Sequence, residues 1–181
     1  LLPVNVAAAL QAAAALGLQW TAGQLEEALG GLRFTGRRQR LHRAGRDYLL
    51  DVAHNPSAVH KLLETIMATS CKGKIITLFS VMRDKDVAAM IEPLLETVDA
   101  WCLADQPGNA RAMPAAEIAD LLRDRGQGMI SVSRNLRQGF ARARQLATED
   151  DLVVVFGSFF TVAAALGALD DTHGQGEPVA T

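Results

Sequence analysis

Short apolar runs alternate with amphipathic segments along most of this chain. The run at residues 152–156 is almost unbroken in its apolar character, which is typical of a strand buried on both faces of a sheet. Similar runs at residues 74–81 and 100–104 predict two more buried strands. Segments with helical spacing separate these runs, so the pattern predicts a largely parallel sheet with helices on both faces.

Further strands and helices are predicted from the spacing of apolar residues and from the positions of turn-forming residues. Residues 39–43 and 48–53 are predicted to form two strands, joined by a turn at residues 44–46. A short strand is predicted at residues 129–132. The predicted helices are residues 87–98, 115–125, 136–147 and 159–169. We therefore expect an α/β, Rossmann-like fold.

The start of the chain predicts a short N-terminal helical segment. Pro3 and Gly17 bound an Ala-rich helix, while Thr21 and Gln24 fit the capping box of a second helix. Because the chain starts without Met and runs at once into helical sequence, we expect that it was cut from a longer protein.

Composition then changes abruptly at a cluster of arginines, which suggests a domain boundary. The cluster consists of Arg33, Arg37, Arg38, Arg40, Arg43 and Arg46. We expect residues 1–31 to be a helical lead-in, residues 32–170 the main domain, and residues 171–181 a flexible tail.

Composition narrows the class of protein. The 181 residues carry 18 Lys and Arg against 20 Asp and Glu, so no broad basic surface is expected and nucleic acid is not an expected partner. The weakly charged stretches at residues 1–21 and 152–169 are Ala-rich or interrupted by polar residues and glycine, so we expect no membrane span. Two cysteines, Cys71 and Cys102, form neither a disulfide framework nor a metal motif, which favours a cytoplasmic location.

Candidate chemistry is sought where the predicted strands end. In an open parallel sheet, ligands bind at the carboxyl ends of the strands, where loops meet helix N-termini. Polar residues follow four of the predicted strands there. These groups are His54-Asn55-Pro56, residues 82–86, residues 105–111 and Gly157-Ser158.

The segment from Asp51 to Pro56 is the most informative of these. An unpaired carboxylate inside an apolar strand would be costly, so Asp51 needs a partner. In a structural interpretation, Asp51 binds backbone N–H groups, Asn55 caps a helix and His54 lies on the surface. In a functional interpretation, Asp51 accepts ribose hydroxyls of a nucleotide and His54 faces its phosphates. The residues alone leave both interpretations open.

Four motifs, taken together, resemble a known family. They are Gly36-Arg37, the D-V-A-H-N-P segment from Asp51, Asp84-Lys85-Asp86 and Val155-Phe156-Gly157-Ser158-Phe159. In this order they are similar to the C-terminal domain of folylpolyglutamate synthase / dihydrofolate synthase, in the Mur ligase superfamily. The G-S-F-x-T-V ending favours the folate branch over the cell-wall branch, and residues 1–31 resemble the end of the family's central ATPase domain.

The resemblance implies an ATP-dependent amide ligase. ATP phosphorylates a carboxylate of a pteroate or folate, and the amine of L-glutamate attacks the acyl phosphate. By this resemblance Asn5 lies at the adenine, Arg37 contacts the nucleotide, Asp51 contacts the ribose and His54 lies near the phosphates. Arg38 departs from the family's usual Gly-Arg-Phe, so either arginine of the pair is a candidate for the nucleotide contact.

The resemblance also implies that Lys85 and Ser158 help to hold the incoming glutamate. A cation and a hydroxyl at a helix N-terminus suit a dicarboxylate, so we expect Lys85 at one carboxylate and Ser158, with the N–H groups of the helix that starts at Phe159, at the other. Structural roles are open here too. Asn5 can be a polar residue at a helix start, Lys85 an exposed cation between Asp84 and Asp86, and Ser158 the N-cap of the last helix.

The chain contains no G-x-x-x-x-G-K-[ST] phosphate-binding loop. A Mur-type ligase requires one, and by the resemblance both this loop and the Mg²⁺ ligands belong to a missing N-terminal ATPase domain. We therefore expect the isolated chain to be inactive. The alternatives are a stand-alone Rossmann-like ligand-binding module and the C-terminal domain of a Mur peptidoglycan-precursor ligase.

Overall fold

The computed structural model describes residues 3–32 and 34–171. Arg33 of the arginine cluster and residues 172–181 of the predicted tail lie outside the described residues. The chain divides into two compact units, with the division between Arg37 and Arg38.

The first unit contains two helices, α1 (Pro3–Ala15) and α2 (Ala22–Gly30). The capping box predicted at the start of α2 is confirmed. Thr21 Oγ1 accepts a hydrogen bond from the Gln24 N–H at 3.3 Å, and Gln24 Oε1 accepts one from the Thr21 N–H at 2.8 Å.

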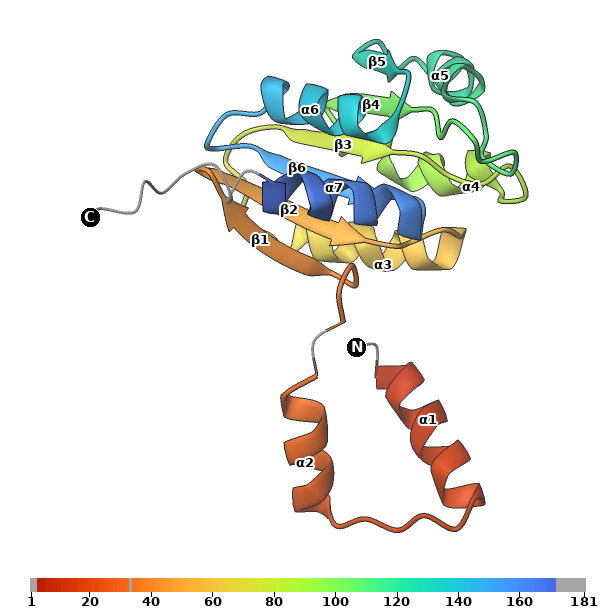
Figure 1. The fold of residues 1–181 in the computed structure, drawn as a ribbon, viewed down its shortest axis with the longest axis vertical. Helices are drawn as coiled ribbons and strands as arrows, with labels where there is room; N and C mark the ends of the chain where they lie inside the picture. The colour runs from red at the N-terminus through yellow and green to blue at the C-terminus, as the bar shows by residue number, and fades with distance from the viewer. Residues whose placement is uncertain (1–2, 33, 172–181) are drawn as a thin grey trace. The chain divides into compact units, whose positions relative to one another are not determined.

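The second unit is built on a six-stranded sheet in the order β1-β2-β6-β3-β4-β5 (Figure 1). The strands are β1 (Gln39–Arg43), β2 (Arg46–Asp51), β3 (Ile75–Phe79), β4 (Ala100–Ala104), β5 (Ile130–Ser133) and β6 (Leu152–Phe156). β1 runs antiparallel to β2, and every other pair of neighbours is parallel. The predicted α/β, Rossmann-like fold is confirmed.

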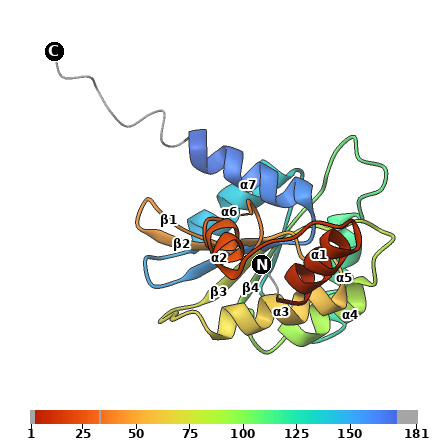
Figure 2. The same cartoon turned by 90° about the horizontal axis from the view of Figure 1, so that it is seen from below.

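Helices cover both faces of this sheet (Figure 2). They are α3 (Pro56–Met67), α4 (Val87–Ile91), α5 (Ala115–Arg123), α6 (Leu136–Leu146) and α7 (Phe159–Asp171), with a 3₁₀ turn η1 (Glu92–Leu94) after α4. Helices α3, α4 and α5 pack over one hydrophobic core, and α6 and α7 pack over the other. Alternate residues of β6 enter the two cores, which explains why its sequence is apolar throughout.

The single helix predicted at residues 87–98 is wrong. The α-helix ends at Ile91, and η1 continues the chain in a tighter turn. Pro93 lies in that turn, and proline has no N–H to continue the α-helical ladder. The predicted strand at residues 74–81 is also shorter, because Ser80 and Val81 bond to groups beyond the β3 ladder.

Register brings three strand ends level at one side of the sheet. Phe156 of β6 pairs with Asp51 of β2 on one side and with Phe79 of β3 on the other. The segments that follow these strands and β4 form what we term the carboxyl edge: residues 52–55, 80–86, 105–111 and 157–158.

No helix within the described ranges is both long and apolar enough to span a membrane.

Candidate functional site

Asp51 ends β2 at the carboxyl edge and is only 8% exposed. Its Oδ1 accepts a hydrogen bond from the Ala53 N–H at 2.8 Å, and its Oδ2 accepts one from the Arg38 N–H at 3.0 Å. The structural interpretation of Asp51 is therefore correct. The same bonds hold the carboxylate in one orientation, which favours a fixed contact with a ligand.

The segment that leads into β1 has an unusual backbone. Gly36 and Arg38 both have positive φ, at 70° and 46°. The left-handed region disfavours an arginine, so the bond from its N–H to Asp51 helps to hold Arg38 there. Arg37 is exposed and Arg38 is half-buried.

Two of the predicted nucleotide residues belong to the first unit. Asn5 is exposed on α1, and Arg37 is exposed at the end of that unit. Their contacts with a nucleotide stay predictions.

His54 follows Asp51 and is half-buried. Its Nδ1 lies 2.8 Å from the Val52 carbonyl oxygen. Because a carbonyl oxygen only accepts, Nδ1 carries the hydrogen, and Nε2 is the nitrogen left to meet a ligand. Asn55 caps α3 by accepting a hydrogen bond from the Ala58 N–H at 2.9 Å, as predicted.

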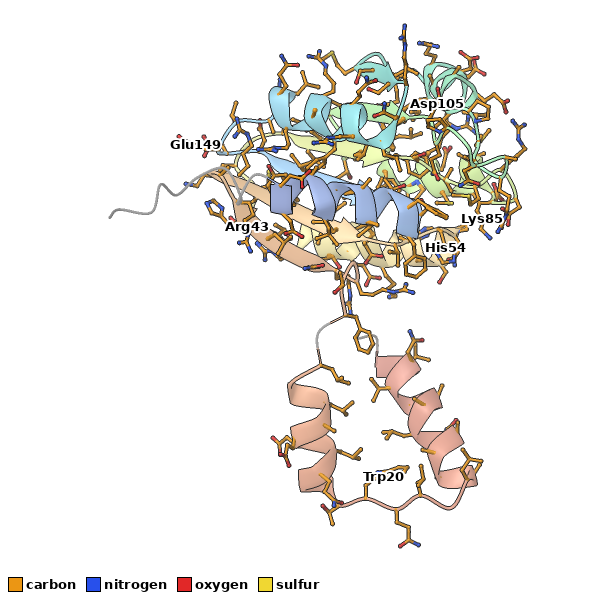
Figure 3. All side chains as sticks on the ribbon, in the orientation of Figure 1. Trp20, Arg43, His54, Lys85, Asp105 and Glu149 are labelled. Carbon is orange, nitrogen blue, oxygen red and sulfur yellow. The ribbon has the colours of Figure 1, made fainter. Side chains whose placement is uncertain are left out.

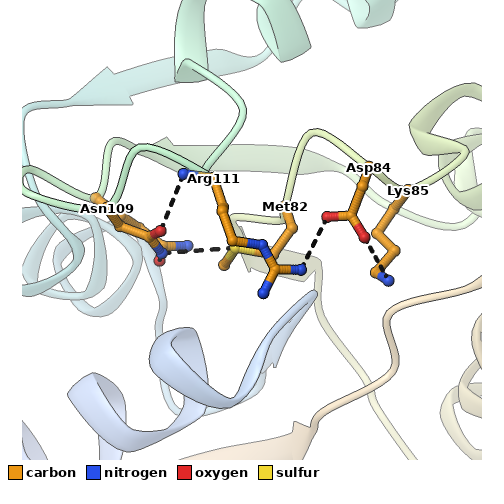
Figure 4. Close-up of polar contacts among 6 residues, drawn as sticks. Met82, Asp84, Lys85, Asn109 and Arg111 are labelled. Carbon is orange, nitrogen blue, oxygen red and sulfur yellow. Dashed lines mark hydrogen bonds and ion pairs between the residues drawn. The ribbon is translucent and has the colours of Figure 1, made fainter.

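Lys85 lies at the same end of the sheet as His54, whereas Arg43 and Glu149 mark the opposite end (Figure 3). Lys85 Nζ lies 2.9 Å from Asp84 Oδ2, and Arg111 Nη2 lies 3.3 Å from Asp84 Oδ1 (Figure 4). The hydrogen bond from Lys85 is the main reason that the pKa of Asp84 is lowered. Two cations share one carboxylate here, so the group retains one net positive charge, which suits an anionic ligand.

The acidic neighbours of Lys85 have different roles. Asp84 pairs with the cation, while Asp86 Oδ1 accepts a hydrogen bond from the Ala89 N–H at 3.0 Å and caps α4. The side chain of Lys85 is 29% exposed. It is therefore less exposed than expected for the solvated cation of the structural interpretation.

Ser158 begins the last helix and is 6% exposed. Its Oγ accepts a hydrogen bond from the Thr161 N–H at 3.1 Å, so the predicted N-cap role is correct. Gly157 before it has φ 110°, a conformation that L side chains rarely adopt. This turn places Ser158 between the ends of β2 and β3, because β6 pairs with both strands.

Sequence reasoning missed a buried polar network beside Ser158. Gln106 Nε2 donates to Ser80 Oγ at 3.0 Å, and the Thr161 hydroxyl donates to the Ser80 carbonyl oxygen at 2.8 Å. Asn109 Nδ2 donates to Gln106 Oε1 at 2.9 Å. Gln106 falls within the polar segment 105–111 predicted to follow a strand, but Ser80 lies inside the strand predicted at residues 74–81, so the pairing of the two did not follow from the sequence.

An open hollow of about 580 Å³ adjoins this network. It lies between the loop after β4 and the starts of α6 and α7, with Gln106, Asn109, Arg137 and Phe160 in its lining. Asp105 at its rim accepts a hydrogen bond from the Ala115 N–H at 2.8 Å, which fixes the start of α5.

The described residues do not fit a metal ion. Residues 3–32 and 34–171 hold no cluster of three or more His, Cys, Asp or Glu side chains that could bind one. The Mg²⁺ implied by the family resemblance is therefore not assigned to side chains of this part of the chain.

Comparison with protein families gives a match over most of the chain. Residues 36–159 match the model "Mur ligase, glutamate ligase domain". This range includes the carboxyl edge and Asp51, His54, Lys85 and Ser158.

Several curated relatives carry the name dihydrofolate synthase/folylpolyglutamate synthase, and two of them align with more than nine tenths of this chain. The protein from Escherichia coli K12 is 30% identical over 173 residues, which cover 96% of this chain and 39% of the relative. The protein from Buchnera aphidicola (Schizaphis graminum) is 28% identical over 166 residues, which cover 92% of this chain and 38% of the relative. The chain thus spans about two fifths of these relatives' length.

Solved structures agree with this. E. coli FolC in complex with DHPP and ADP has a TM-score of 0.79 at 28% identity, covering 91% of this chain and 38% of that chain. A bifunctional folylpolyglutamate synthase/dihydrofolate synthase with Mn, AMPPNP and L-glutamate bound has a TM-score of 0.75 at 30% identity. The match covers 84% of this chain and 36% of that chain.

Proposed function

Because this chain belongs to the Mur ligase family through its glutamate ligase domain, we propose that it serves as the C-terminal domain of an ATP-dependent ligase that adds L-glutamate to dihydropteroate or folates. Relatives with that name align with nearly all of the chain. The observation that carries the proposal is the register of β2, β6 and β3, which brings Asp51 and Ser158 to one edge of the sheet.

The proposed reaction forms an amide bond in two steps. A carboxylate oxygen of the pteroate or folate attacks the γ-phosphorus of ATP, so that ADP leaves and an acyl phosphate forms. The amine of L-glutamate then attacks the acyl carbon, loses a proton and displaces inorganic phosphate. This domain's part in both steps is to bind and orient reactants, and the phosphate-binding loop and Mg²⁺ ligands are proposed to belong to a separate ATPase domain.

Nucleotide binding is assigned to Asn5, Arg37, Asp51 and His54, as the resemblance implies. The carboxylate of Asp51 supports this role. Two hydrogen bonds from backbone N–H groups fix its orientation, and a carboxylate can accept more than two hydrogen bonds, including one from a ribose hydroxyl. His54 supports it because the contact of its Nδ1 with the Val52 carbonyl oxygen leaves Nε2 as the ring nitrogen available to a ligand.

Glutamate binding is assigned to Lys85 and Ser158. The net positive charge of Lys85, Arg111 and Asp84 supports the binding of a carboxylate. Lys85 is only partly exposed, so its charge is less screened than that of a fully solvated lysine.

A cytoplasmic location is part of the same proposal. Cys71 and Cys102 are both free thiols, which supports a reducing compartment.

Steady-state kinetics of the full-length ligase that contains this chain would test the function. We expect glutamate-dependent ADP formation with dihydropteroate or a folate. Asp51→Asn and Arg37→Ala should each raise the KM for ATP roughly ten- to hundredfold and leave the KM for glutamate unchanged, since a charge-assisted hydrogen bond contributes about 1.5 to 3 kcal/mol. Asp47→Asn is a matched control, because Asp47 lies at the other end of β2 and bonds to His42 at 2.8 Å.

Two results would contradict the proposal. Unchanged ATP affinity in both folded variants would remove Asp51 and Arg37 from the nucleotide site. Turnover with a nucleotide-sugar peptide in place of pteroate or folate would place the chain in the cell-wall branch of the family.

A further inference from the structure

Arg38 adopts a backbone conformation that is rare for its residue type. Among the residues that the structure describes, Arg38 and Ala44 are the only non-glycine residues with positive φ, at 46° and 49°. Ala44 forms the two-residue turn between β1 and β2 together with Gly45, and a tight turn of this kind requires positive φ at both positions. Arg38 lies before β1 and is not part of that turn, so its conformation has a different cause.

The pairing of β1 with β2 shows where residue 38 lies. Gln39 pairs with Leu50. Residue 38 therefore comes opposite Asp51, one step beyond that pair. Hydrogen-bonded and non-hydrogen-bonded pairs alternate in an antiparallel ladder, and counting from the two-residue turn places position 38 at a non-hydrogen-bonded pair. An extended residue at such a pair points its N–H away from the partner strand, so a regular strand would direct the Arg38 N–H away from β2.

The left-handed conformation turns this N–H toward β2. A left-handed residue directs its own N–H and the next one to the same side, whereas an extended residue directs them to opposite sides. The Arg38 N–H can then donate to Asp51 Oδ2, at 3.0 Å. This bond therefore depends on the conformation of residue 38 and not on its side chain.

The bond is important because of the position of Asp51 in the site. Asp51 is 8% exposed, and its Oδ1 accepts a hydrogen bond from the Ala53 N–H, two residues further along the same chain segment. The Arg38 N–H reaches the other oxygen from the neighbouring segment, so the two donors restrain the carboxylate from two directions. Loss of the Arg38 bond would remove one of these restraints, and a carboxylate that can rotate is a weaker partner for a ribose hydroxyl.

We propose that Arg38 is a positioning residue for the nucleotide and acts through its main chain. Its left-handed conformation directs its N–H to Asp51 and thereby fixes the carboxylate that contacts the ribose. The inference rests on the proposed function and deepens it, because the resemblance alone leaves both Arg37 and Arg38 as candidates for the side-chain contact. On this assignment residue 37 contributes its charge to the nucleotide site, and residue 38 contributes its backbone conformation.

Two variants of residue 38 in the full-length ligase isolate the backbone effect. Arg38→Val and Arg38→Gly both remove the guanidinium and both keep the N–H. They differ in the left-handed region, which glycine enters readily and a β-branched residue strongly disfavours. Arg38→Val should therefore have a KM for ATP roughly three- to tenfold above that of Arg38→Gly, while their KM values for glutamate should agree within about twofold.

A second pair of variants sets charge against conformation. Arg38→Lys keeps a positive charge, whereas Arg38→Asn loses it but has a residue type that is enriched in the left-handed region. The inference requires the lower KM for ATP in Arg38→Asn, and a side-chain contact requires it in Arg38→Lys. This pair also decides the question if Arg38→Val does not fold, which melting temperatures measured in parallel would reveal.

Position 37 provides the matched control. Arg37 does not have positive φ, so Arg37→Val and Arg37→Gly should both raise the KM for ATP, and by factors that agree within about twofold, because each loses the same charge. A double-mutant cycle then tests whether Arg38 acts through Asp51. In the Asp51→Ala background the acceptor is absent, so adding Arg38→Val should change the KM for ATP by less than about twofold.

Equal KM values for ATP in Arg38→Val and Arg38→Gly would overturn the inference, since conformation at residue 38 would then have no effect on the nucleotide. Fully additive effects of Arg38→Val and Asp51→Ala would also overturn it, because the two residues would then act separately. Both results leave ATP-dependent ligation of glutamate, and hence the proposed function, intact. A wild-type ligase without turnover that depends on ATP and glutamate would instead reject the proposed function, and this inference with it.

Discussion

Replacing Gly157 by alanine tests how closely the carboxyl edge is packed where α7 begins. Gly157 has φ 110° and lies directly between β6 and Ser158. A Cβ atom at this position would lie 2.5 Å from the Ser80 carbonyl oxygen and 2.8 and 2.9 Å from two ring carbons of Phe79. The variant therefore combines an unfavourable backbone conformation with a steric clash.

The two effects have separate magnitudes. A non-glycine residue in a sparsely populated backbone region costs about 1 to 3 kcal/mol. Forcing an extra methyl group into a packed site costs about 1 to 3 kcal/mol more. Phe79 cannot easily retreat, because its ring stacks on Phe156 with centroids 4.5 Å apart. We expect Gly157→Ala to lower the free energy of unfolding by roughly 2 to 6 kcal/mol, a large share of the 5 to 15 kcal/mol of a typical domain.

Urea unfolding and thermal melting of this chain would measure the effect, which corresponds to a fall in Tm of roughly 5 to 20 °C. Two glycines provide controls. Gly108 has φ 82° and no atom within 4 Å of a built Cβ, so Gly108→Ala should show only the backbone cost. Gly167 lies inside α7 with the same open space, so Gly167→Ala should stabilise the protein by about 0.5 to 1 kcal/mol. If Gly157→Ala costs no more than Gly108→Ala, the reasoning about close packing is refuted.

Three further predictions concern pH, substrate and turnover. Burial raises the pKa of the Asp151 carboxyl, but hydrogen bonds from Thr148 and Lys74 outweigh burial and lower it. The stabilising effect of that carboxylate is therefore present above its unfolded pKa and is lost as pH falls through the lower folded pKa. Urea titrations should show Asp151→Asn less stable by about 1 to 3 kcal/mol at pH 7, with a gap that closes as the pH falls through the lowered pKa of the folded protein; a constant gap would contradict this. Lys85→Ala in the full-length ligase should raise the glutamate KM roughly two- to fivefold, whereas the exposed Arg83→Ala should not; equal effects would point to general surface charge. The isolated chain should release no phosphate from ATP with glutamate and dihydropteroate, and release above a heat-inactivated control would contradict the proposed need for a separate ATPase domain.

Much of the fold follows from hydrophobic period alone. The bounds of β4 and β6 are predicted without error, because each is a short apolar run between polar residues. Helix α4 was predicted too long because Val87, Met90, Ile91 and Leu94 keep a helical apolar spacing through the turn that contains Pro93. The spacing of apolar residues indicates which face of a helix is buried. It does not separate the two helix types here, because a 3₁₀ turn can bury the same face as an α-helix.

The site was only partly predictable. Asp51 stands out in the sequence because a carboxylate at the end of an apolar strand needs partners, but its partner at Arg38 depends on the β1–β2 pairing. Gln106 and Ser80 are ordinary polar residues in the sequence, and they become a pair only when β3 and β4 lie side by side. A hydrogen-bond network across strands depends on how the strands pair and in which register, and the sequence alone does not specify either.

The position of β6 has a consequence for how the protein is made. Among the described residues β6 is the last strand along the chain, yet it lies between β2 and β3 in the middle of the sheet. While the chain emerges from the ribosome, β2 and β3 cannot reach their final pairing until the end of β6 is available, so the sheet closes late in synthesis. Until then each has an unpaired apolar edge, and such edges promote association between chains. Because these pairings are far apart along the chain, we expect slow folding that is sensitive to protein concentration and to truncation before Phe156.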